Sequence, residues 1–267
     1  MHHWRLSTAI LTSQRSFLEN IDEGCGRFIA EQYMFIGLVN EYLGLSPPSA
    51  ESQAQPYNSF LDLSSYYRDR CSMCAYALFE IIPRIAGFAS KPSKSVPRHL
   101  DPEMIEEFHG LEEDILQWDI QNPVTFPSDI PTEPETDEIK AAIIQQLALL
   151  ITLHCALHGP GTPHANIKRQ VDYCITEAMA LMKEITPPSS AWGMLLWPLA
   201  HIASCITVRE VQDDFVAVIS NMENKVHGCT KLLSLLSRFW SSEQEGFYGP
   251  YGIREFLSRE GMRPCFG

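Results

Sequence analysis

The sequence predicts an all-α protein, an irregular multi-helix bundle in which antiparallel helices pack around a central buried helix. Apolar residues recur every three or four positions through most of the 267 residues, which is the spacing of one helix face. Sustained alternation of polar and β-branched residues, the pattern typical of strands, does not occur. The segment 191–205 (AWGMLLWPLAHIASC) is almost entirely apolar, so it is expected to be the buried helix that the others surround.

The N-terminal part of the chain is expected to form three helices. The first two cover residues 4–19 and 28–43, where apolar side chains follow helical spacing. The third covers residues 66–89 and contains Pro83, and the loop SKPSKSVPRH follows it. Each of these helices is expected to have one apolar face that another part of the chain covers.

A fourth helix is expected to begin after Asp101. An aspartate followed by Pro102 and Glu103 combines an N-cap, a proline at the first helical position and an acid in the first turn. The apolar stripe behind this start predicts five buried residues, Ile105, Phe108, Leu111, Ile115 and Trp118.

A proline-rich stretch, residues 121–135, separates two halves of the chain, about residues 1–120 and 136–267. The helices on either side have apolar faces that need covering. We therefore expect the stretch to be a long surface connection within a single helical domain, residues 1–267, and not a boundary between domains.

The second half is expected to contain the remaining helices. The first starts at Thr136 or Asp137 and ends before the sequence HGPG at 158–161. The next covers residues 163–185, and its apolar spacing of four, three, four, three and four predicts antiparallel packing against a neighbour. Beyond the apolar segment 191–205, helices are expected at residues 208–226, 230–240 and 253–259.

Within the segment 191–205, Pro198 is expected to bend the helix or to end its first half at Trp197, because proline removes a backbone hydrogen bond. The polar groups that follow, His201, Ser204 and Cys205, are explained by ordinary core pairing or by a ligand-sensing role. The second hypothesis gives a candidate effector pocket, which consists of Trp192, Trp197, His201 and Cys205.

Charge and cysteine usage limit the partners and the compartment. The formal net charge of −13 repels phosphate backbones, so direct binding of nucleic acid by this chain is not expected. The eight cysteines are spread through apolar segments, and the N-terminus lacks the features of a signal peptide, which predicts an intracellular protein, nuclear or cytoplasmic and not secreted. The longest apolar run, residues 141–157, is interrupted and is shorter than a membrane helix requires, so no membrane partner is expected.

Two groups of residues resemble metal ligands without completing a metal site. Cys71 and Cys74 have the spacing of half a zinc site, but a structural site needs a second pair. His154 and His158 lie one helical turn apart, with Cys155 and His164 nearby and without the glutamate of a metalloprotease motif. Neither group is expected to bind a metal, and no cofactor is expected.

A third group suggests an alternative, enzymatic function. Glu210, Asp213 and Asp214 place three acids on one side of a helix, as in helical diphosphate enzymes that hold Mg²⁺ through oxygen ligands. A solvated helix face explains the same residues. The chain contains no GxSxG, P-loop or GxGxxG motif, so no reaction and no catalytic residue is specified.

Three segments resemble one family. MLLWPLAHIASC at 194–205 resembles a core helix of the fungal-specific transcription factor regulatory domain, the C-terminal helical region of many Zn₂Cys₆ zinc-cluster regulators. LFEIIPRIAGFASK at 78–91 and FIAEQYMFIGLVNEYLG at 28–44 are similar to two further helices of that family, and LLSLLSRFW at 232–240 fits its closing pattern. The resemblance covers most of the chain in the family's order.

The resemblance implies a helical domain that regulates transcription, senses a metabolite or contacts a transcriptional partner, and is often associated with secondary metabolism. The family's DNA-binding module needs six closely spaced cysteines followed by basic residues, and this sequence has neither. The implied function is therefore that of a regulatory domain without its own DNA-binding module, which could form a homodimer. A diverged stand-alone enzyme of isoprenoid or cyclisation chemistry remains the alternative.

Overall fold

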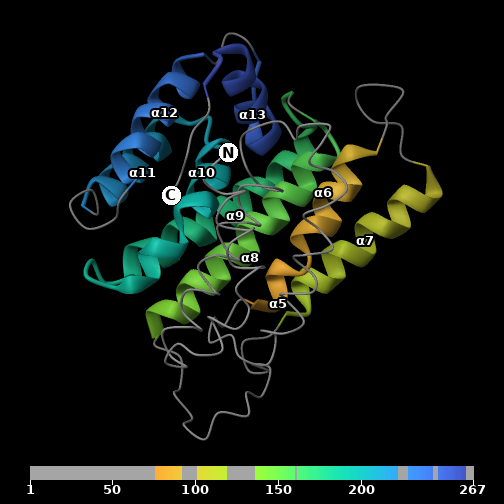
Figure 1. The fold of residues 1–267 in the computed structure, drawn as a ribbon, viewed down its shortest axis with the longest axis horizontal. Helices are drawn as coiled ribbons and strands as arrows, with labels where there is room; N and C mark the ends of the chain where they lie inside the picture. The colour runs from red at the N-terminus through yellow and green to blue at the C-terminus, as the bar shows by residue number, and fades with distance from the viewer. Residues whose placement is uncertain are drawn as a thin grey trace, which may run out of the picture.

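The computed structural model describes residues 76–91, 101–118, 136–159, 161–221, 228–242 and 246–262, and within these ranges every regular element is a helix (Figure 1). The all-α class is therefore confirmed. The helices expected at residues 4–19 and 28–43 and the connection at 121–135 lie outside the described residues. The described elements, in order, are α5 (Tyr76–Phe79), α6 (Ile82–Ser90), α7 (Pro102–Leu116), α8 (Thr136–Ala156), α9 (Ala165–Glu184), the 3₁₀-helix η3 (Ser190–Met194), α10 (Leu196–Ala203), α11 (Arg209–Ser220), α12 (Cys229–Ser241) and α13 (Gly249–Arg259).

Helix α8, green in Figure 1, lies at the centre of the described part of the chain and contacts α6, α7, α9, α10 and α13. Its side chains are buried on every side from Ala148 to Ala156, so it has no single apolar stripe. Because the helix already begins at Thr136, its length and composition would suffice to cross a membrane, contrary to our expectation. However, 78% of its most apolar stretch is buried inside the protein, so other helices cover this surface.

The predicted helix at residues 66–89 is divided within the described residues. Helix α5 ends at Phe79 and α6 begins at Ile82, which places Pro83 in the first turn of α6. Proline is well tolerated in a first turn because the N–H that it lacks would have no partner within the helix. The residues before Tyr76 lie outside the described part.

The start of α7 is confirmed, since the Asp101 carboxylate accepts a hydrogen bond from the Met104 N–H at 2.8 Å and Pro102 is the first helical residue. The predicted stripe is correct for Phe108, Leu111 and Ile115 but wrong for Ile105, which is 41% exposed; Trp118 is partly buried against the core. Met104 is buried instead, because the spacing of four, three and four residues from position 104 follows one face of the helix.

The segment 191–205 is buried as predicted, but it is not one continuous helix. It consists of η3 and α10, with a break at Leu195. In an unbroken helix the Pro198 ring would clash with the Met194 carbonyl, four residues earlier. The break therefore lies two residues before the predicted position at Trp197, and Pro198 is in the first turn of α10, where it bends nothing.

Helix α9 runs antiparallel to α8, as its spacing predicted, and the two are joined by a short connection after Gly159. Helices α11, α12 and α13 follow in the order expected, and α12 and α13 lie against α10. The main differences are at helix ends: α11 ends at Ser220 and α13 already begins at Gly249. Together with α8, helices α12 and α13 pack around α10, and the candidate effector residues are buried in protein.

Candidate effector site on α10

His201 on α10 is bonded to Thr152 on α8. The Thr152 hydroxyl donates to the Ala148 carbonyl at 2.7 Å, and its oxygen lies 2.8 Å from His201 Nδ1. Since the single hydroxyl proton is used toward Ala148, the oxygen must accept from the imidazole. His201 therefore carries a proton on Nδ1, and both side chains are buried.

Trp197 lies one turn before His201 on the same helix, and the two rings meet edge to face at a centroid distance of 5.6 Å. The Trp197 indole N–H is buried and has no hydrogen-bond partner. Two of the four predicted pocket residues thus lie next to each other, and one of them has an unused donor.

Gln145 on α8 is a site residue that the sequence analysis missed. Its side chain is 1% exposed, and neither its amide oxygen nor its amide nitrogen has a hydrogen-bond partner. Gln145 precedes Thr152 by seven residues, so both are on the same face of α8. Residues 141–153 contain three polar side chains, Gln145, Gln146 and Thr152, and the sequence alone does not tell which of the two glutamines lacks a partner.

The C-terminal end of α10 is fully paired by its neighbours. The Trp240 indole N–H from α12 donates to the Ala203 carbonyl at 3.0 Å, and the Gly249 N–H at the start of α13 donates to the Ser204 carbonyl at 2.9 Å. Cys205, the fourth predicted pocket residue, has its sulfur 3.9 Å from the sulfur of Cys155 on α8. This end of α10 is therefore a structural junction of four helices.

Two buried thiols near this junction, Cys155 and Cys174, are not poised as nucleophiles. The interaction with Cys205 and burial raise the pKa of the Cys155 thiol well above its usual value. Burial also raises the pKa of the Cys174 thiol to about 11 and raises the pKa of the nearby Tyr248 phenol. All three groups stay protonated at neutral pH, whereas a catalytic cysteine needs a thiolate.

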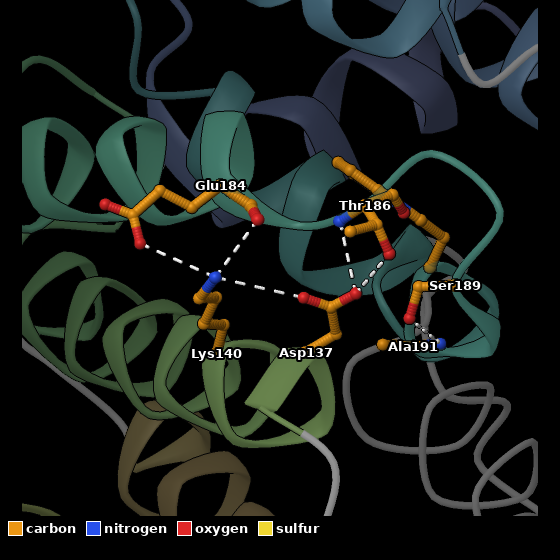
Figure 2. Close-up of polar contacts among 7 residues, drawn as sticks. Asp137, Lys140, Glu184, Thr186, Ser189 and Ala191 are labelled. Atoms are coloured by element: carbon orange, nitrogen blue, oxygen red, sulfur yellow. Dashed lines mark hydrogen bonds and ion pairs between the residues drawn. The ribbon is translucent and has the colours of Figure 1, made fainter.

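Trp192, the remaining predicted pocket residue, is directed elsewhere. Its indole N–H donates to the Thr186 carbonyl at 3.1 Å, where the chain leaves α9. Figure 2 shows the polar contacts of this joint: the Asp137 carboxylate accepts from the Thr186 N–H at 3.1 Å and from the Thr186 hydroxyl, and the Lys140 ammonium donates to the Glu184 carbonyl at 3.0 Å. Trp192 therefore helps to hold α9 against α8.

The histidines considered as metal ligands have separate partners. His154 Nε2 lies 3.3 Å from a carboxylate oxygen of Glu112 on α7. His158 Nε2 accepts a hydrogen bond from the His164 N–H at 3.1 Å, while Cys155 contacts Cys205. In the described part of the chain no three His, Cys, Asp or Glu side chains are grouped so that they could hold a metal ion. Cys71 and Cys74 lie outside it.

The acids of the alternative magnesium site lie on the exposed side of α11. Asp213 forms an ion pair with Arg209 at 3.1 Å, and Asp214 forms one with Lys183 of α9 at 3.2 Å. Glu210 is in the first turn of α11, where the helix dipole favours an acid. Surface ion pairing and the helix dipole account for all three, so the described residues give no support to a diphosphate enzyme.

Comparison with known proteins identifies the family of the chain. A family model described as the fungal specific transcription factor domain matches residues 3–266, which is essentially the whole chain. No curated protein and no solved structure gives a significant match to the sequence. The chain therefore belongs to the fungal-specific transcription factor domain family.

Proposed function

We propose that this chain is a transcription-regulatory domain that changes the activity of a zinc-cluster-type regulator when a small effector binds beside α10. The family match over residues 3–266 supports the regulatory role. The observation that carries the effector is the buried Trp197 N–H without a partner, because buried donors in folded proteins are nearly always paired. The thiols of Cys155 and Cys174 are buried and protonated, which suits a binding domain better than an enzyme.

In this proposal a separate module reads DNA. The sequence lacks a six-cysteine cluster followed by basic residues, and its net charge of −13 opposes binding to phosphate backbones. The domain would act in the nucleus, reaching it from the cytoplasm, through a partner protein or a second copy of itself. Genes of secondary metabolism are the target class that the family resemblance suggests.

A tethering experiment tests the regulatory role. The full chain is fused to an unrelated DNA-binding domain, and transcription of a reporter carrying the matching operator is measured in a fungal host. We expect the fusion to change reporter output relative to the DNA-binding domain alone. Trp197→Phe should alter the response to the growth conditions that change the output. Trp192→Phe is the matched control, since Trp192 bonds to the chain itself.

Deletion of the gene provides the opposing test. The proposal expects altered transcription of a set of target genes in the deletion strain. Normal transcription together with an accumulated biosynthetic intermediate would contradict it and would favour an enzyme. Retained product formation after alanine replacement of Asp213 and Asp214 would in turn remove the basis for the magnesium-dependent alternative.

A further inference from the structure

Two contacts fix the relative direction of α8 and α10. Thr152 meets His201, and three residues further along α8 Cys155 meets Cys205, four residues further along the second segment. The two segments therefore run parallel at this contact. Few parallel neighbours are expected in a bundle of short connections, and here α9 provides the return path between them.

This register places Gln145 and Trp197 on the facing sides of α8 and α10. Gln145 is seven residues before Thr152, about 20° around the helix, and Trp197 is four residues before His201, about 40° around. Side chains in a helix lean toward its N-terminus, so both extend away from the Thr152 and His201 pair in the same direction. The two unpartnered polar groups thus occupy the same side of the interface.

Gln146, the next residue on α8, shows that the fold can provide a hydrogen-bond partner for a glutamine side chain. The Gln146 side-chain N–H donates to the Ile115 carbonyl of α7 at 2.6 Å and lies 3.4 Å from the Trp118 carbonyl. Gln145, which is even more deeply buried, has no bond at either end of its amide. A buried amide without partners strongly destabilises a fold. Gln145 therefore needs an explanation in terms of function, whereas the bonded Gln146 does not.

Three of the four residues one turn away from Gln145 on α8 are alanines, Ala141, Ala142 and Ala148, and the fourth is Leu149; all four are buried. Alanine side chains on either side of Gln145 cover its amide less than larger side chains of the same helix would. Small residues and unpaired polar atoms therefore coincide at this part of the interface.

We propose that the α8–α10 interface binds a small neutral molecule of the amide or lactam class, held by Gln145 and Trp197. A carbonyl oxygen of the ligand would accept from the Trp197 indole N–H and the Gln145 amide N–H, and a ligand N–H would donate to the Gln145 amide oxygen. A charged ligand is disfavoured because neither side chain offers a countercharge at this depth. The existence of this binding site does not depend on the proposed function. Only its biological role, the sensing of an effector, rests on that proposal.

Thermal unfolding of the full chain tests the assignment, with the lactam 2-piperidone as the probe. Gln145→Leu removes the unpaired amide at nearly constant volume, and Gln146→Leu is the matched control that removes a bonded one. Without the probe, we expect Q145L to raise the Tm and Q146L to lower it. With the probe at a concentration well above a Kd on the order of 1 mM, the Tm should rise for the natural sequence and Q146L but not for Q145L.

The indole N–H signal of Trp197 in a ¹H–¹⁵N spectrum is the second measurement, assigned from its loss in Trp197→Phe. Addition of 2-piperidone should shift this signal, and Q145L should weaken the binding at least tenfold. No shift, an equal response in Q145L, or a Q145L variant destabilised as much as Q146L would overturn the assignment. Each of these failures leaves the reporter result untouched, so loss of the site and loss of the regulatory function are separate outcomes.

Discussion

Thr152 is the residue on which the polar pairing between α8 and α10 depends. One hydroxyl satisfies the Ala148 carbonyl and the His201 Nδ1–H together, and both bonds lie in the core. Removing the hydroxyl removes the buried bond between Thr152 and His201 that joins α8 to α10.

We expect Thr152→Val to lower the free energy of unfolding by about 1–3 kcal/mol, and Thr152→Ser to restore much of it. Urea denaturation followed by tryptophan fluorescence measures both. Thr176→Val is the matched control, because the exposed Thr176 hydroxyl donates to the Asp172 carbonyl four residues earlier in the same geometry. If T152V and T176V were equally mild, His201 would not depend on Thr152.

At this scale the sequence could identify part of the site. It indicated His201 and Trp197 because polar and aromatic groups stand out in an apolar segment, and both lie together in the structure. It could not identify Gln145, since an interruption of an apolar run does not show whether the fold provides a partner. The sequence analysis also placed Ile105 in the core. The buried residue is its neighbour Met104, because a shift of one position along α7 turns a side chain toward another face of the helix.

Among the elements, α13 is attached to the junction through its first residue. Gly249 has φ +71°, and a Cβ at this position would lie 2.9 Å from the Cys155 sulfur and 3.4 Å from the Cys205 sulfur. Only glycine combines this backbone conformation with so close an approach. The start of α13 is therefore fixed against both α8 and α10.

We expect Gly249→Ala to destabilise the protein by about 2–4 kcal/mol, from backbone strain together with overpacking. Gly246→Ala isolates the first contribution, about 1 kcal/mol, because Gly246 has φ +74° with open space where the Cβ would be. Equilibrium unfolding of both variants gives the difference. Adding Cys155→Ala to G249A should recover part of the loss, and a lack of recovery would show that the sulfur contact is not the cause.

The joint between α8 and α9 gives a prediction that depends on pH. Hydrogen bonds from the Thr186 hydroxyl and N–H, with Lys140 nearby, hold the pKa of Asp137 below its ordinary value. A lowered folded-state pKa stabilises the protein above the unfolded-state value of about 4, and this contribution is lost as the pH falls toward the folded-state pKa.

Asp137→Asn should therefore cost about 1 kcal/mol at pH 7 and reduce the acid sensitivity of stability below about pH 4. Unfolding curves between neutral and acidic pH measure both effects. Asp114→Asn is the control, since Asp114 is paired with Arg84 at 2.6 Å on an open surface, where such pairs contribute little. Equal effects of the two substitutions would contradict the importance of the joint.

Helix starts were more predictable than the arrangement of the helices. Asp101 and Pro102 specify a local start, and the structure begins α7 there. The sequence pointed to the segment 191–205 as the centre, yet α8 contacts more of the surrounding helices. The segment 191–205 and the second half of α8 are both apolar on nearly all sides, so periodicity cannot rank them.

For the whole molecule, buried histidines determine how stability changes in mild acid. Burial lowers the pKa of His154 and of His158, and the neighbouring His164 adds to the shift at His158. The hydrogen bond from the His164 N–H to His158 Nε2 also requires that nitrogen to be unprotonated. The folded state thus binds fewer protons than the unfolded state once the pH falls below about 6.5.

We expect the free energy of unfolding to decrease between about pH 6.5 and pH 5, by up to about 1.4 kcal/mol per pH unit for each histidine. The double variant His154→Asn with His158→Asn should flatten this dependence. The exposed His109→Asn should not change it. Chemical denaturation at several pH values distinguishes them, and an unchanged slope in the double variant would assign the effect to other groups.

The four cysteines in the described part of the chain are all buried, so they can be used to time the opening of the molecule. Cys155, Cys174 and Cys229 belong to α8, α9 and α12, and Cys205 follows α10 directly. A thiol reagent can modify each cysteine only after its own helix separates from the rest. The labelling rate of each cysteine therefore measures how often its helix opens. Four equal labelling rates would mean that the junction opens as one cooperative unit, whereas a faster Cys229 would show α12 leaving first. Without any introduced probe, the same measurement with and without a ligand would show which helix the ligand holds closed.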